Sequence, residues 1–181
     1  MKKTLIAALM LATVSFGSSA VMAQTMIGNS PQAIDLTDGA GFFGDMFTAN
    51  NQGNTFADRF TFAVSGTSGS NLDAIISSFS RSADTGLDIT GLALYGADDM
   101  LISSGTAAQS GTLDVWTISS GNLMAGNYYL QVSGNVVGTT PSSFGGAVML
   151  APVPEPETYG MLLGGLGLLG FLARRRKAKQ D

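Results

Sequence analysis

The clearest alternation of apolar and polar residues lies between Phe56 and Phe62. Side chains along a β-strand point to opposite faces in turn, so Phe56, Asp58, Phe60 and Phe62 are predicted to share one face. We expect the three aromatic rings to pack inward, with the Asp58 carboxyl group among them. This segment is therefore predicted to be a half-buried strand.

Shorter runs of the same kind follow at intervals of roughly ten residues and are separated by Gly, Ser and Asn. Residues 24–54 differ, because they mix Gly, Asn, Thr and Asp with only a few aromatic residues. The pattern predicts an all-β domain, an antiparallel β-sandwich or jelly roll of about seven to nine short strands. The further predicted strands are Ala74–Phe79, Ile89–Tyr95, Met100–Ser103, Leu113–Ile118, Tyr128–Ser133 and Phe144–Leu150.

The N-terminal segment breaks this pattern and has the features of a secretory signal peptide. Lys2 and Lys3 precede an apolar stretch, and the small-x-small pattern that ends at Ala23 follows it. We expect residues 1–23 to direct the chain to the Sec machinery, and signal peptidase to cut between Ala23 and Gln24. An uncleaved N-terminal anchor is the alternative, but the apolar stretch is short for one.

The C-terminal segment breaks the pattern again. An uncharged apolar run from Tyr159 to Ala173 follows a proline- and glutamate-rich stretch and precedes a basic cluster. Its helix would reach only ~22 Å, short of the ~30 Å hydrocarbon core, although flanking cations can snorkel to compensate. The proline-rich stretch is Val153, Pro154, Glu155, Pro156 and Glu157, and the basic cluster is Arg174, Arg175, Arg176 and Lys177.

We interpret this arrangement as a β-sandwich ectodomain at 24–151, an extended linker at 152–157, a transmembrane helix at 158–173 and a basic cytoplasmic tail at 174–181. Prolines in the linker disfavour regular helix there. The basic cluster is expected to stay in the cytoplasm, with the ectodomain on the far side of the membrane. A buried core helix with a polar end is the alternative, and four consecutive cations argue against it.

The order of proline-rich motif, Gly/Leu-rich helix and arginine cluster resembles the PEP-CTERM sorting signal of Gram-negative bacteria. The matching parts are Val153–Glu157, Gly160–Leu172 and Arg174–Arg176. The resemblance implies recognition near the PEP motif by an exosortase, a membrane-embedded cysteine peptidase or transpeptidase. It further implies passage through the inner membrane and then release to the cell surface or extracellular matrix.

Two FxDxF units, thirteen residues apart, resemble a subset of PEP-CTERM proteins named for this motif. Each aspartate lies between two phenylalanines at alternate positions, so it must find a hydrogen-bond donor at the edge of the core. A calcium or ligand carboxylate is one interpretation, and an aspartate that ties down a turn or strand edge is the interpretation that we favour. The units comprise Phe43, Asp45 and Phe47, and Phe56, Asp58 and Phe60.

A second local resemblance concerns residues 123–134, which read Leu-Met-Ala-Gly-Asn-Tyr-Tyr-Leu-Gln-Val-Ser-Gly. They are similar to a strand of bacterial pre-peptidase C-terminal-like sandwich modules. Physically, Ala-Gly-Asn makes a tight turn, and the paired tyrosines begin a strand with one apolar face. The resemblance supports a β-sandwich.

Composition argues against most enzyme chemistry and against nucleic-acid binding. Residues 24–157 hold twelve acidic residues and two basic ones, Arg59 and Arg81. The chain contains no histidine and no cysteine, which excludes serine and cysteine triads and conventional zinc sites. We therefore expect no catalytic residue, no resident metal and no cofactor. An aspartate-dependent hydrolase is the least favoured alternative.

Two kinds of ligand stay open as alternatives. Calcium prefers oxygen ligands, and several aspartates fall in predicted loops or strand ends. Aromatic faces bind sugars, so a carbohydrate-binding module displayed at the surface is the main rival to a non-enzymatic matrix protein associated with exopolysaccharide or biofilm. The residues in question are Asp84, Asp88, Asp98 and Asp99 for calcium, and Tyr95, Trp116, Tyr128 and Tyr129 for carbohydrate.

Overall fold

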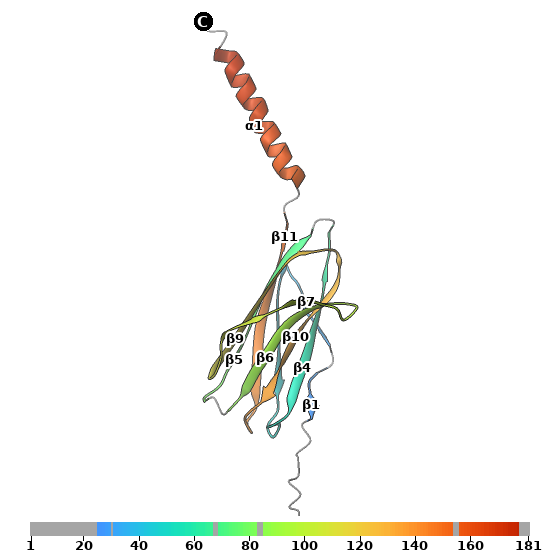
Figure 1. The fold of residues 1–181 in the computed structure, drawn as a ribbon, viewed down its shortest axis with the longest axis vertical. Coiled ribbons are helices and arrows are strands. Elements are labelled where there is room, and N and C mark those ends of the chain that lie inside the picture. Colours follow the sequence, from blue (N-terminus) through green and yellow to red (C-terminus); the bar gives the residue numbers. More distant parts are fainter. Residues whose placement is uncertain (1–24, 30, 67–68, 83–84, 154–155, 178–181) are drawn as a thin grey trace, which may run out of the picture.

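The structure is a computed structural model that describes residues 25–29, 31–66, 69–82, 85–153 and 156–177. Within these residues, eleven strands form two stacked sheets, and one helix leaves the end of the sandwich (Figure 1). The predicted all-β sandwich is confirmed. The predicted signal peptide lies outside the described residues, as do Asp84, Pro154 and Glu155.

The first sheet has the order β1-β4-β10-β6-β7, with β2 also paired to β4. Its strands are β1 (Met26–Ile27), β2 (Gln32–Ala33), β4 (Thr55–Val64), β6 (Leu87–Gly96), β7 (Leu101–Ser104) and β10 (Gly126–Val136). The second sheet has the order β3-β11-β5-β9-β8, and all its pairings are antiparallel. Its strands are β3 (Ala40–Phe47), β5 (Ser70–Phe79), β8 (Thr106–Gln109), β9 (Leu113–Leu123) and β11 (Ser142–Pro152).

Strand β4 follows the predicted alternation. Phe56, Phe60 and Phe62 are buried together with Asp58, while Arg59 and Ala63 point to solvent. The apolar faces of β6 and β10 alternate in the same way, and those of β5 and β11 close the core from the other sheet. The fully buried aliphatic residues include Leu72, Ile76, Leu92, Leu94, Leu130, Val132 and Val148.

Trp116 on β9 belongs to the core margin rather than to an open groove. Its ring packs against the hydrophobic core, and its indole N–H donates to the Ile89 carbonyl oxygen over 3.0 Å. Asp114 and Ile118 share its inward face and are buried. A partly buried tryptophan whose N–H is hydrogen-bonded to the backbone is typical of a packing residue.

Residues 24–54 hold strands that the sequence pattern did not predict. β1 and β2 have two residues each and pair with β4 in parallel, so they are too short to show an alternation. β3 carries phenylalanine on both faces, because Phe42 is exposed while Phe43 and Phe47 are buried. The short edge strand β8 is exposed throughout, which likewise hid it.

The C-terminal helix α1 (Pro156–Lys177) begins two residues earlier than predicted and includes the basic cluster. The expectation of an extended linker up to Glu157 is therefore wrong for Pro156 and Glu157. Proline suits the first helical position, because its missing N–H would have no partner there, and Glu157 in the first turn complements the helix dipole. In the described part of the chain, no helix is long and apolar enough to cross a membrane.

Candidate functional site

The two FxDxF units face each other across the sandwich. Phe43 of β3 packs against Phe60 of β4 with ring centroids 4.9 Å apart, and Phe47 packs against Phe56 at 4.6 Å. The second unit thus runs antiparallel to the first, and Asp45 and Asp58 lie at the centre of both. Two motifs that are thirteen residues apart in sequence therefore form one packed cluster that joins the two sheets.

Phe144 of β11 completes the aromatic cluster. Its ring lies 5.7 Å from Phe56, 6.0 Å from Phe60 and 6.4 Å from Phe47. Aromatic pairs at these distances stabilise a core beyond the area that they bury. The aspartates are therefore held by packed rings on either side, an arrangement that suits a structural unit.

Asn29, just after β1, connects the two carboxyl groups. Its backbone N–H donates to Asp58 Oδ1 over 3.0 Å, and its side-chain amide donates to Asp45 Oδ2. Gly28 lets the chain approach so closely, because a Cβ at this position would lie 2.5 Å from Asp58 Oδ1. The N-terminal segment is thereby tied to the two aspartates.

Asp58 is 1% exposed, and its burial raises the pKa of the carboxyl group to about 7. The hydrogen bond from Asn29 lowers this pKa, whereas the Asp45 carboxyl group raises it further. Asp58 Oδ2 is buried and has no hydrogen-bond partner. A proton on Asp58 would give this oxygen a hydrogen bond, because a protonated carboxyl group is able to donate to the neighbouring Asp45 carboxyl group. The geometry therefore supports a pair of carboxyl groups that holds a proton near neutral pH.

The calcium candidates do not come together as a ligand set in the described residues. Asp98 Oδ1 accepts from the Met100 N–H within the turn between β6 and β7, and Asp88 accepts from Asn135. Asp99 is engaged by Arg59 and Tyr129. In the part of the chain that the structure describes, no three acidic side chains are grouped as metal ligands.

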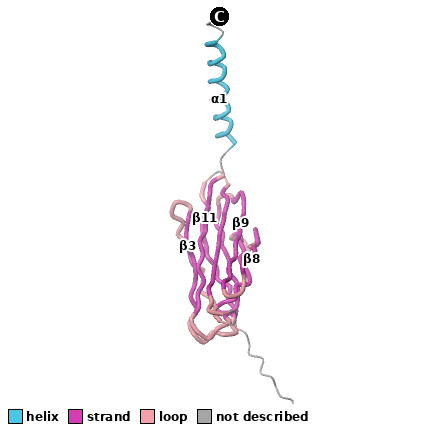
Figure 2. Tube along the Cα trace, turned by 90° about the vertical axis from the view of Figure 1, so that its left-hand side faces the viewer, coloured by secondary structure: helices cyan, strands magenta, loops and turns pink. Residues whose placement is uncertain are grey.

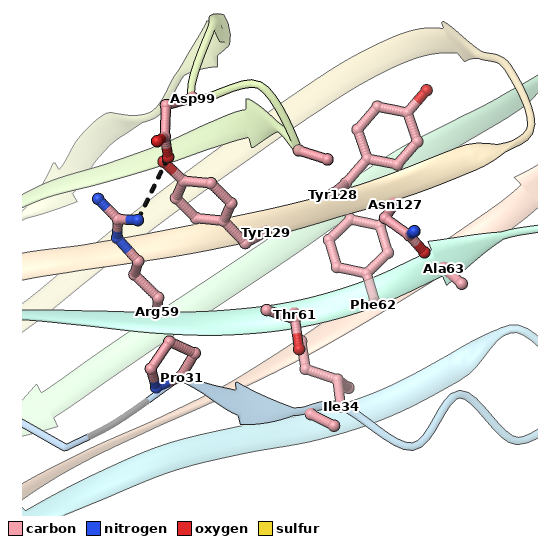
Figure 3. Close-up of a pocket in the computed structure, with 12 residues that line it drawn as sticks. Pro31, Ile34, Arg59, Thr61, Phe62, Ala63, Asp99, Asn127, Tyr128 and Tyr129 are labelled. Carbon is pink, nitrogen blue, oxygen red and sulfur yellow. Dashed lines mark hydrogen bonds and ion pairs between the residues drawn. The ribbon is translucent and has the colours of Figure 1, made fainter.

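A second candidate site lies on the outer face of the first sheet, where Tyr129 is covered on both sides. Tyr95 stacks on its ring at 5.0 Å, and the Arg59 guanidinium lies 4.8 Å from the ring centroid. The Tyr129 hydroxyl donates to Asp99 Oδ1 over 2.7 Å, and Arg59 pairs with the same oxygen at 3.2 Å (Figure 3). Burial, followed by the bond to Asp99, raises the pKa of Tyr129 to about 12. It stays a neutral donor at physiological pH.

A cavity of about 640 Å³ opens beside this cluster. Its wall combines the Arg59, Asp99 and Asn127 side chains with the apolar surfaces of Tyr128 and Ile34 (Figure 3). Ligand sites in proteins typically have this size and this mixture of an apolar lining with a few polar groups. The cavity is able to hold a small polar ligand.

The sorting motif begins where the domain ends. The Val153 N–H donates to the Gly69 carbonyl oxygen over 2.8 Å, so this residue is still bound to the sandwich. Glu157 already lies in α1, and the cluster Arg174–Lys177 forms its last turn. The motif Val153–Glu157 thus spans the junction between the last strand and the first turn of the helix.

Sequence reasoning found both aspartates and their need for a donor, but not the donor itself. Asn29 and Gly28 follow a two-residue strand and carry no motif of their own. Asp114, also buried, was recognised only as a polar position within a strand. The cavity was missed because its lining comes from four distant segments.

Two solved structures show weak similarity to the sandwich. The pre-peptidase C-terminal domain of collagenase from Bacillus anthracis is 16% identical, with coverage of 69% of this chain and 93% of that one and a TM-score of 0.36. PliG from Aeromonas hydrophila, a periplasmic inhibitor of g-type lysozyme, is 11% identical, with coverage of 71% and 99% and a TM-score of 0.42. A TM-score below 0.5 does not establish a common fold, so neither similarity bears on function.

No curated protein matches the chain. Residues 152–177 match the family profile of the PEP-CTERM protein-sorting motif. This range starts at the last residue of β11 and ends at the last residue of α1. The match covers the predicted sorting signal, so the chain carries a PEP-CTERM protein-sorting motif at these residues.

Proposed function

We propose that this protein is displayed at the cell surface or in the extracellular matrix after exosortase acts on its C-terminal motif. The observation that carries the proposal is the PEP-CTERM motif at residues 152–177, which indicates exosortase-type sorting of an exported protein. The motif sits directly after the last strand, so a cut there separates a folded domain from a helix.

In this proposal, the apolar run of α1 holds the chain in the inner membrane until exosortase cuts the chain. The run is short for a full span, and the flanking cations compensate by snorkelling. Residues from Tyr159 to Ala173 carry no charge, and the basic cluster that follows stops transfer and keeps the C-terminus in the cytoplasm. The N-terminal signal peptide directs the chain into the Sec machinery at the start of export and is removed by signal peptidase.

The β-sandwich is the cargo, and we propose a non-enzymatic role in exopolysaccharide or biofilm. The absence of histidine, cysteine and, between residues 24 and 153, lysine and glutamate leaves aspartate and tyrosine as the candidate acid–base groups there. Of the two most buried aspartates, Asp114 is held by backbone N–H groups and Asp58 by Asn29 in the core. Both serve packing in this interpretation.

Mass spectrometry of the mature C-terminus tests the sorting proposal. In the native bacterium, the surface fraction is expected to contain chains that lack Tyr159 onward, and deletion of the exosortase gene should leave the full tail in place. Replacing the tripeptide Pro154-Glu155-Pro156 by alanines is expected to have the same effect, whereas Thr158→Ala serves as the control. A tail that stays attached in the surface fraction would contradict the proposal.

A second candidate function is carbohydrate binding in the cavity beside Tyr129. Its mixture of one guanidinium, one carboxylate, one amide and aromatic surface favours a polar, uncharged ligand such as a glycan. Arg59→Ala is expected to abolish retention on the bacterium's own exopolysaccharide, and Arg81→Ala, at the other ectodomain arginine, is the matched control. Equal retention of both variants would exclude this cavity as the binding site.

A further inference from the structure

The outer face of the second sheet is apolar. Side chains that point away from the core on β3, β5 and β11 include large apolar residues that are between 46% and 86% exposed. Figure 2 shows the strands of this sheet side by side. A contiguous apolar surface on a folded domain marks an interaction site. The residues concerned are Phe42, Met46, Ile75, Phe79 and Met149.

A hollow of about 300 Å³ lies on this face, between β11, β5 and β9. Ile75, Ala147 and Met149 are among the residues that line it. On the neighbouring strand pair, Gly44 lies opposite Gly145, and a Cβ at Gly145 would meet no heavy atom within 4 Å. The hollow is able to receive a large apolar side chain from a facing surface.

The distribution of charge indicates which partner surface packs against this face. The outward positions of β3, β5, β9 and β11 carry one ionisable side chain, Asp73, which accepts a hydrogen bond from Ser119. The rest of the domain is strongly acidic, so two copies repel each other in most orientations. This face is where two copies approach without bringing many carboxylates together. A charged partner, by contrast, would find almost no opposite charge here.

The area of the face also suits a dimer. The five strands hold 44 residues in total, and at ~3.3 Å per residue and ~4.8 Å between strands they cover ~700 Å². One partner buries about this area in a standard protein–protein interface. A twofold axis presents the same patch on both copies, so the apolar side chains and the hollow of one copy meet those of the other.

We propose that the protein forms a homodimer in which the outer face of the second sheet packs against the same face of a second copy. The side chains of Phe42 and Met149 lie within this contact, and Ser77 lies near its centre. The inference stands on the sandwich alone and does not depend on how the tail is processed.

Cysteine cross-linking of the full chain tests this dimer, because the natural sequence has no cysteine. Facing sheets lie ~10 Å apart, so a bismaleimide of about that length should join Ser77→Cys in one copy to the same residue in its partner. Ser104→Cys, an exposed serine on β7 of the other sheet, is the matched control. Dimer formed with Ser77→Cys and not with Ser104→Cys supports the proposal, whereas no dimer, or equal dimer from both, overturns it.

A charge placed in the contact gives an independent measurement. Phe42→Asp, added to Ser77→Cys, sets like charges across the twofold axis, which costs several kcal/mol and should lower the cross-linked fraction more than about tenfold. Leu101→Asp on β7, also exposed, should leave it unchanged. Melting curves establish that each variant is folded. Undiminished cross-linking in a folded Phe42→Asp variant would overturn the proposal.

Discussion

Two aspartates, Asp58 and Asp114, are equally buried in this sandwich but are satisfied in different ways. Asp114 receives the backbone N–H of Ile89 on one oxygen and that of Gly111 on the other, at 3.1 and 3.0 Å. Asp58 receives one N–H, leaves its second oxygen without a partner and has another carboxyl group beside it. The difference teaches that equal burial does not mean equal hydrogen bonding, because fixed donors reach both oxygens of Asp114 but only one oxygen of Asp58.

Asp114 also has a structural function that Asp58 lacks. The backbone N–H of Ile89 donates to Asp114, and the Ile89 carbonyl oxygen accepts from Trp116. Two side chains of β9 thus bind both backbone polar groups of one residue of β6. The register between β6 and β10 shifts next to this position. Side chains of the second sheet thus stabilise β6 at the point where its pairing with β10 is irregular.

The largest expected effect is a loss of stability with rising pH. The pKa of Asp58 is raised from 3.8 to about 7 by folding, so the folded state binds a proton that the unfolded state has lost between these values. The free energy of unfolding should therefore fall as the pH rises from about 4 to 8, by at most about 4 kcal/mol at 1.4 kcal/mol per pKa unit. Urea denaturation at each pH measures this.

The control for this experiment is Asp58→Asn, which keeps the shape and removes the titration. Its stability should change little over the same range and should exceed that of the natural chain at pH 8. A natural chain that is equally stable at pH 5 and pH 8 would show that Asp58 is ionised when folded.

A smaller effect is expected for Asp114→Asn at neutral pH. The asparagine side chain has an NH₂ group in place of one of the two carboxylate oxygens that accept from Ile89 and Gly111. One of these backbone N–H groups therefore loses its acceptor, which should lower the free energy of unfolding by about 2–3 kcal/mol. Urea denaturation at pH 7 measures the loss, with the exposed Asp35→Asn as the control. If Asp114→Asn were as stable as Asp58→Asn at pH 7, the contrast between the two sites would disappear.

Trp116→Phe should cost about 1 kcal/mol or slightly more. The ring still packs against the core, but the Ile89 carbonyl oxygen loses its donor, and a typical hydrogen bond contributes about that much. Thermal unfolding of the variant and of Asp114→Asn, separately and combined, shows whether the two contacts act together on Ile89. Strict additivity would mean that they are independent.

The smallest effect is expected for Asp45→Asn. It removes the negative charge beside Asp58, so the pKa of Asp58 should move down and the pH-dependent loss of stability should begin at lower pH. The net change at pH 7 is expected to be under about 1 kcal/mol. An unchanged pH profile would mean that the two carboxyl groups do not interact.

The predictable parts of this molecule are those in which neighbouring residues carry the information. The face shared by Phe56, Asp58 and Phe60 follows from the two-residue period of a strand, and the sorting motif is a continuous stretch. By contrast, the pairing of Asp45 with Asp58 depends on how two sheets stack. Asn29, which donates to both carboxyl groups, lies just after a strand with only two residues, and β3 has aromatic residues on both faces. The alternation of apolar and polar residues along one strand does not predict contacts of this kind, which join distant segments.

The position of β11 has a mechanical consequence. This strand lies between β3 and β5, antiparallel to both, and leads directly into the sorting motif. A pull on that end loads β11 along its own axis, so the hydrogen bonds on both sides are sheared together rather than opened one at a time. The domain is therefore built to bear tension through its last strand.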